Sequence, residues 1–167
     1  LWSNISRNQT IDYYQVETDY ILKNRPTVQL PGGSMVFTEN VTLPKGWKIE
    51  KGNGTDTTDG FRGVLHIVDA KGELKGTFER LIFYDSNTDS KKQGVAANGA
   101  YSFTQTGDKV ALGIVVPMDW LMAADRQYPV TIDPTATNTY ASYGSLYWGG
   151  FTAGCQQSMN VNVPAGT

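Results

Sequence analysis

Histidine and cysteine, on which many metal centres and nucleophilic active sites depend, each occur once in the 167-residue chain, as His66 and Cys155. This scarcity excludes most zinc sites and most Ser–His or Cys–His catalytic arrangements. His66 is in the middle of the apolar run 64–68, where strand alternation places it opposite Leu65 and Ile67. A catalytic base needs a nucleophile or an orienting acid at a matched position, and the sequence indicates neither. We therefore expect no enzyme activity, with His66 on the rim or solvent face of a strand.

A partial calcium motif occupies a polar stretch further along the chain. Asp85, Asn87 and Asp89 alternate at a spacing of two, as the oxygen ligands of short calcium-binding loops do. The pattern then departs from the EF-hand loop, because Ser90 replaces its glycine and Ala96 its bidentate glutamate. Two interpretations stay open: a calcium site on these three residues, or a polar loop held by Asx-turns. Apart from this calcium, we expect no cofactor.

Aromatic residues gather near the C-terminal end of the sequence. Tyr143, Tyr147 and Trp148, flanked by Tyr140 and Phe151, are candidates for a platform on which sugar rings stack. The other interpretation is that these side chains fill the core of a further β-module, since large aromatic groups contribute much of the buried area of protein interiors.

Composition limits the classes of protein that have to be considered. Hydrophobic residues make up 40% of the chain and charged residues 18%, and the chain has 9 Tyr, 6 Phe and 4 Trp, which together exclude disorder for most of it. The formal net charge is −2, so the chain lacks the excess of basic residues that is typical of nucleic-acid-binding proteins. No run approaches the roughly 18 apolar residues of a membrane span. We expect neither a nucleic-acid partner nor a membrane span.

The elements that must position these residues are predominantly strands, because the dominant hydrophobic period is two. The predicted strands cover residues 10–22, 34–43, 47–49, 64–68, 73–84, 100–104, 109–116 and 128–133. A change of phase near Asn40 suggests a bulge in the second of them. Many short strands separated by turns predict an all-β, antiparallel sandwich of the jelly-roll or immunoglobulin-like kind.

Turn signals and one helix complete this outline. Residues 69–72 and 105–108 are typical hairpin connections. The Gly-, Asn- and Asp-rich stretch between Glu50 and Gly63 predicts an exposed loop, and residues 85–98 a second one. A short helix is expected near 117–124, where Pro117 suits a first turn.

The composition changes after Asp133–Pro134, and no charged residue follows from 135 to 167. We expect a β-sandwich module over 1–134, then a linker and the first strands of a further, truncated β-module over 135–167. The chain is then a piece of a larger polypeptide. On this interpretation Cys155 is either a small buried residue or half of a disulfide whose partner follows Thr167.

The segment Val115–Thr135, above all Trp120-Leu121 and Tyr128-Pro-Val-Thr-Ile-Asp-Pro134, resembles the ending of a β-rich module of very large bacterial proteins. These are secreted and surface proteins, including YD/RHS-repeat-like proteins and the gliding-motility adhesins that Bacteroidetes export through the type IX system. Leu43-Pro-Lys-Gly-Trp47 fits the same pattern, and the resemblance covers about residues 10–135. It implies a location and a structural role, with no catalytic residue to carry over.

The same resemblance singles out one modification site. In Bacteroidetes, Asp56-Thr57-Thr58 is similar to the short Asp-Ser/Thr motif that carries O-linked glycans, which makes Thr57 a candidate.

The sequence thus predicts a non-catalytic, extracellular structural or adhesive module of a large bacterial cell-surface or secreted protein. Its expected partners are neighbouring modules of the same polypeptide, and surface polysaccharide or other cell-surface proteins. Two alternatives stay open: a carbohydrate-binding module, and an accessory or pro-domain of a secreted hydrolase.

Overall fold

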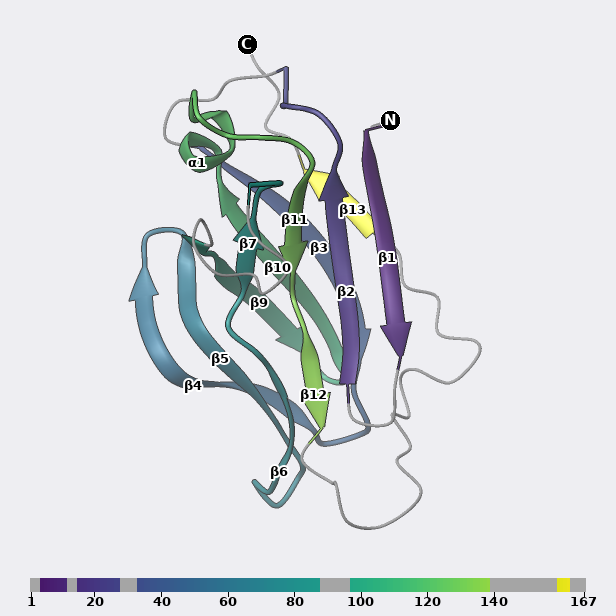
Figure 1. The fold of residues 1–167 in the computed structure, drawn as a ribbon. Coiled ribbons are helices and arrows are strands. Elements are labelled where there is room, and N and C mark those ends of the chain that lie inside the picture. The colour runs from purple at the N-terminus through teal and green to yellow at the C-terminus, as the bar shows by residue number, and fades with distance from the viewer. Residues whose placement is uncertain (1–3, 12–14, 28–32, 88–96, 139–158, 163–167) are drawn as a thin grey trace.

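The fold is mostly antiparallel β-sheet with one short helix, which confirms the predicted all-β, sandwich-like class (Figure 1). The computed structural model describes residues 4–11, 15–27, 33–87, 97–138 and 159–162. In chain order the elements are β1 Ile5–Ile11, β2 Gln15–Leu22, β3 Ser34–Thr42, β4 Lys48–Thr57, β5 Gly60–Val68, β6 Leu74–Phe78, β7 Ile82–Tyr84, β8 Ala97–Asn98, β9 Ala100–Thr106, β10 Lys109–Pro117, α1 Met118–Met122, β11 Val130–Asp133, β12 Ala136–Asn138 and β13 Met159–Asn162.

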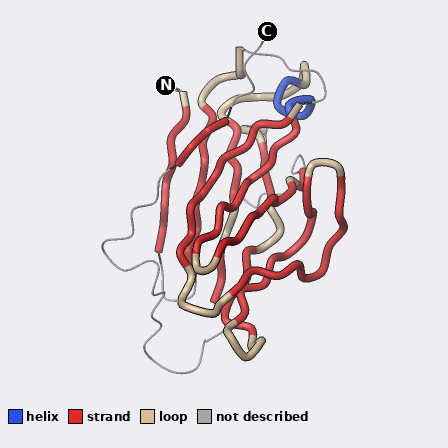
Figure 2. The backbone as a smooth tube through the Cα atoms, turned by 180° about the vertical axis from the view of Figure 1, so that it is seen from behind, coloured by secondary structure: helices blue, strands red, loops and turns tan. Residues whose placement is uncertain are grey.

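The strands form two layers, although all of them are connected by hydrogen bonds in one continuous order. The path runs β13-β3-β10-β9-β5-β6-β12-β2-β11-β7-β8, with β1 added to β2 and β4 added to β5. β1, β2, β11 and β12 lie in front of β3, β10 and β9, and β6 with β12 joins the two layers (Figure 1). Seen from behind, the helix sits at one end of the strands (Figure 2).

The core lies between these layers because alternate residues of each strand point inward. On β2, Tyr20 and Leu22 are buried, and Phe37 on β3 faces them, its ring 4.6 Å from that of Tyr20. Leu112 and Ile114 of β10 belong to the same cluster. Apolar area removed from water in this way is the main favourable term in folding.

The predicted bulge near Asn40 was wrong. The register of β3 against β10 is unbroken from Ser34 to Thr42, and its burial alternates regularly. The apparent change of phase has a different cause. Glu39, a charged residue, occupies an inward position between Phe37 and Val41, and it is only 6% exposed.

The predicted loop between Glu50 and Gly63 was also wrong, because β4 and β5 form a long hairpin there. The glycines of this stretch serve close packing across the ladder. Gly54 is paired with Gly63, and a Cβ on Gly63 would fall 2.6 Å from the Cα of Gly54. The register shifts between Lys51 and Gly54, which marks a β-bulge.

The apolar run 73–84, predicted as one strand, is divided between β6 and β7. β6 pairs with β5 and β12, whereas β7 pairs with β11 and β8. Between them Glu79 donates its N–H to Thr135, and Leu81 is buried. The region 10–22 is divided in a similar way, with β2 beginning at Gln15 and β1 ending at Ile11.

Both predicted hairpin turns, and the helix, are confirmed. Gly72 and Gly107 adopt φ values of 82° and 61°, as the tight connections after β5 and β9 require. Asp69 holds the first turn by accepting the N–H groups of Lys71 and Glu73 on Oδ1, at 2.8 and 2.9 Å. The helix α1 falls inside the expected range 117–124.

The strands that follow the expected boundary at residue 135 pair with strands that precede it. β12 places Ala136 opposite Val16 of β2 and Phe78 of β6, and β13 pairs with β3. The division of the chain into two modules stays a prediction. Among the residues that the structure describes, no helix is long and apolar enough to cross a membrane.

Candidate functional site

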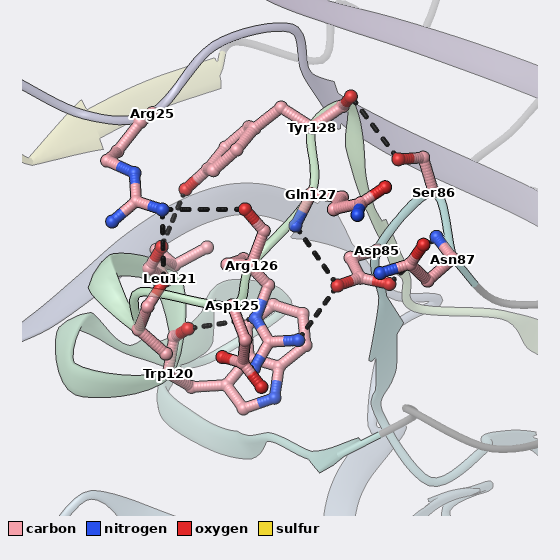
Figure 3. A network of polar contacts seen from close by, with 11 residues as sticks. Arg25, Asp85, Ser86, Asn87, Trp120, Leu121, Asp125, Arg126, Gln127 and Tyr128 are labelled. Atoms are coloured by element: carbon pink, nitrogen blue, oxygen red, sulfur yellow. Dashed lines mark hydrogen bonds and ion pairs between the residues drawn. The ribbon is translucent and has the colours of Figure 1, made fainter.

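The most elaborate group of polar side chains lies beside α1 and ties the loop after β7 to the segment that enters β11 (Figure 3). Asp85 is only 2% exposed. Its Oδ2 accepts hydrogen bonds from Arg126 Nη1 at 2.8 Å and from the N–H of Gln127 at 3.2 Å, and its Oδ1 accepts the N–H of Asn87 at 3.0 Å. Burial by itself would raise the pKa of Asp85, but these donors outweigh it and hold the pKa below the ordinary value.

Arg126 connects this carboxylate to α1. Its guanidinium lies over the ring of Trp120, 4.0 Å from the ring centre, and its Nε donates to the Trp120 carbonyl at 3.1 Å. The Trp120 ring also makes a T-shaped contact with Phe83 of β7, with 4.5 Å between ring centres. A cation on an aromatic face and a charged hydrogen bond thus fix the helix against β7.

Tyr128 and Arg25 hold the other side of the helix. The Tyr128 hydroxyl donates to the carbonyl of Leu121 at 2.8 Å (Figure 3). Arg25 Nη1 donates to the carbonyl of Met122 at 2.7 Å. Burial raises the pKa of Tyr128 to about 12, in spite of the nearby positive charges of Arg25 and Arg126. Leu121 is completely buried beneath these contacts.

Two residues of the calcium hypothesis therefore belong to this network. Both oxygens of Asp85 accept hydrogen bonds from the chain, and the backbone of Asn87 forms the Asx-turn that was the alternative interpretation. Asp89 lies outside the described residues, so the calcium site stays a prediction.

The other predicted site residues are not brought into this network. Tyr143, Tyr147 and Trp148 lie outside the described residues. Thr57 is half-buried at the end of β4, where its hydroxyl donates to the carbonyl of Gly60 at 2.8 Å. Sugar stacking and O-glycosylation stay predictions.

His66 is half-buried on β5, on the face opposite Leu65 and Ile67. Within the described part of the chain, no hydrogen bond or ion pair involves its side chain. The ring lies against Gly52 instead.

Glu39, a buried acid between the layers, was not predicted from the sequence. Its Oε1 accepts hydrogen bonds from Arg7 Nε at 3.2 Å and from the hydroxyl of Tyr20. Its Oε2 is buried and has no hydrogen-bond partner among the described residues. Burial raises the pKa of Glu39, and the Arg7 guanidinium only partly opposes that effect. The alternation of the strand could have revealed it, because Glu39 falls on the same face as the inward residues Phe37 and Val41.

A small cavity opens beside Glu39 and is lined by residues of β1, β2, β3, β6, β10 and β12. Its volume of about 30 Å³ is room for one or two water molecules. The polar residues at its wall are Arg7, Gln9, Thr18 and Glu39, and the remaining wall is apolar.

One group of three potential metal ligands occurs among the described residues. Carboxylate oxygens of Glu17 and Asp19 on β2 and of Asp133 on β11 lie within 4.8 Å of one another, and all three residues are half-buried. Asp133 Oδ1 also accepts the hydroxyl of Thr135 at 2.6 Å. Such oxygen donors are of the type that hard divalent cations bind.

No family model, curated protein or solved structure matches this chain.

Proposed function

We propose that this chain is a non-catalytic structural module of a large bacterial cell-surface or secreted protein, an adhesin or filament segment. The observation that carries the proposal is the position of α1, in the segment 115–135, at one end of the strands (Figure 2). In that segment the residues that resemble the ending of bacterial surface modules are used for packing.

Four residues of the segment, Trp120, Leu121, Tyr128 and Pro134, have such a contact or are buried. Trp120 lies between Phe83 and Arg126, Leu121 is fully buried, and the Tyr128 hydroxyl holds the helix backbone. Pro134 directly follows β11 and is itself buried, which suits a residue that ends a strand because proline cannot donate to a ladder. Packing therefore accounts for the residue types that carry the resemblance.

The buried ionisable groups support the same proposal. Asp85 and Glu39 each pair with an arginine of another element, an arrangement that links parts of the fold. The cavity beside Glu39 holds about 30 Å³, whereas sites for drug-sized ligands occupy roughly 300–1,000 Å³. It is too small for a sugar chain or a peptide substrate.

In this proposal the module lies outside the cell, and its partners are neighbouring modules of one long polypeptide and the polysaccharides or proteins of the cell surface. Export by the type IX system and participation in gliding motility follow from the resemblance alone.

An antiserum raised against the recombinant chain tests the proposal in bacteria that encode it. We expect brief protease treatment of intact cells to remove the antigen, and we expect a native mass far above the 18.3 kDa of this chain. An antigen that resists protease until the cells are lysed, or that migrates near 18 kDa, would contradict the proposal. Retention of the chain on a polysaccharide, abolished by Trp148→Ala, would replace it with sugar binding.

A further inference from the structure

The three residues Arg7, Tyr20 and Glu39, here called the Glu39 cluster, connect the two layers of the sandwich. Arg7 is on β1 and Tyr20 on β2 in one layer, and Glu39 is on β3 in the other. The side chain of Arg7 is 23% exposed and that of Glu39 is 9% exposed, so this ion pair is mostly shielded from water. β1 joins the strand path through β2 alone among the described strands.

Within the cluster, only one of the two carboxylate oxygens of Glu39 receives hydrogen bonds. Oε1 receives both donors, while Oε2 has neither a donor among the described residues nor access to solvent. A charged carboxylate needs several donors when it is removed from water, and an oxygen without one is costly. A protonated carboxyl differs, because it carries no net charge to be removed from water and its hydroxyl can act as a donor.

Glu39 faces few other ionisable groups in the described structure. From β1 it faces Arg7 and from β2 Tyr20. The cavity wall from β6, β10 and β12 is apolar, namely Phe78, Leu112, Ile114 and Ala136. Met159–Asn162, which form β13 beside β3, include no ionisable residue type.

We propose that the protonation state of Glu39 controls how tightly β1 and β2 are held against β3, with the neutral acid favouring the closed layers. Opening of this edge hydrates Glu39 and thereby stabilises its charged form. Rising pH therefore promotes opening, and acid favours closure. This goes beyond a purely static role for the module.

Thermodynamic linkage sets the size of the effect. Between the ordinary pKa of 4.5 and the higher pKa of the buried carboxyl, the equilibrium constant for opening rises by up to tenfold per pH unit. Below that window the carboxyl is protonated in both states and the dependence disappears.

Hydrogen exchange followed by mass spectrometry tests the proposal on the wild-type chain and on Glu39→Gln, which keeps a neutral side chain of similar shape. At each pH the ratio of wild-type to variant exchange rates cancels the chemical pH dependence of exchange. For peptides covering β1 and β2 we expect this ratio to rise with pH, up to tenfold per unit within the window. Glu50→Gln, the same change on an exposed acid of β4, is the control, and its ratio to wild type should stay constant.

A ratio to Glu39→Gln that stays flat between pH 4 and 8 would overturn the proposal. If that variant does not fold, the wild-type chain still decides the question by carbon-13 NMR titration of the Glu39 carboxyl. A titration midpoint well above 4.5 that coincides with increased exchange of β1 supports the proposal, and a midpoint at or below 4.5 overturns it.

Discussion

The imidazole of His66 lies against the Cα of Gly52 across the β4–β5 ladder, so closely that a Cβ on residue 52 would be 2.5 Å from Nε2. Glu50, and not Gly52, is the direct partner of His66 in the register. The ring therefore lies diagonally over a position where only a hydrogen leaves room for it. Diagonal neighbours in a sheet are within reach of aromatic side chains.

We predict that Gly52→Ala lowers the free energy of unfolding by about 1 kcal/mol, because the ring must move. Gly54→Ala should cost more, about 2–3 kcal/mol, since its Cβ would meet the backbone of Arg62 and Gly63. Urea denaturation of each variant measures the difference. His66→Ala should rescue Gly52→Ala but not Gly54→Ala, and equal losses in both backgrounds would contradict the contact.

This contact also explains why the sequence was misleading between residues 50 and 63. Glycine and asparagine are typical of turns because they tolerate unusual backbone angles. A different reason explains the glycines at 52, 54 and 63. Rings and backbone approach so closely across the ladder that a Cβ would not fit. Composition alone does not distinguish these two uses of glycine. The hairpin at 69–72 was predictable, because its turn residues lie between two apolar runs.

The Asp85 network shows a second reason why part of the structure could not be predicted from the sequence. The sequence correctly placed the helix and the strand that ends at Pro134, because proline and apolar periodicity act locally. Asp85 and Arg126 are 41 positions apart, and their pairing follows from the way that β7 meets β11. Glu39 shows the same limit, since its partner Arg7 is on a strand that the sequence analysis did not predict.

The buried Asp85–Arg126 pair should be necessary for stability. We expect Asp85→Asn to cost about 2–3 kcal/mol at neutral pH, because it leaves Arg126 buried without its counter-charge. Asp125→Asn is the control, since that side chain is 81% exposed and lies 3.7 Å from Arg126. Denaturant unfolding measures both, and a loss below 0.5 kcal/mol for Asp85→Asn would contradict the assignment.

The same pair predicts a pH dependence whose sign follows from the lowered pKa of Asp85. A lowered pKa in the folded state contributes stability above the unfolded value of 3.8. This contribution is lost as the pH falls through the lower, folded pKa. The stability difference between wild type and Asp85→Asn should thus be constant from pH 7 down to about 4 and decrease below that. A difference that decreases already near pH 6 would point to another group.

The Tyr128 hydroxyl should lose its proton at a higher pH than an ordinary tyrosine. Its raised pKa, about 12, means that its hydroxyl still donates to Leu121 at pH 11, where an ordinary tyrosine is mostly ionised. Stability from this group is present below pH 10 and decreases as the pH rises toward 12. The difference in ultraviolet absorbance between wild type and Tyr128→Phe isolates its titration. We also expect Tyr128→Phe to cost about 1 kcal/mol through the lost hydrogen bond.

Arg7 and Glu39 should be strongly coupled in a double-mutant cycle. Arg7→Ala removes the cation beside the Glu39 carboxyl, and we expect a loss of about 2 kcal/mol at a pH above the raised pKa of Glu39, where the buried carboxyl is charged. In the Glu39→Gln background the same change should cost less than 1 kcal/mol, because no buried charge is left without its partner. Arg62→Ala, at an exposed pair with Asp59, is the control and should stay within 0.5 kcal/mol.

The pH dependence of this cycle has the opposite sign to that of Asp85. Because the pKa of Glu39 is raised in the folded state, the charged form opposes folding, and the stability of the wild type relative to Glu39→Gln decreases as the pH rises above 4.5. Unfolding measured at pH 4.5, 6 and 7.5 should show the stability of the wild type relative to Glu39→Gln decreasing from pH 4.5 upward and becoming constant above the raised pKa of the folded state. An advantage for the wild type that grows with pH would mean that Arg7 compensates the charge fully, and the Glu39 cluster would then be an ordinary ion pair.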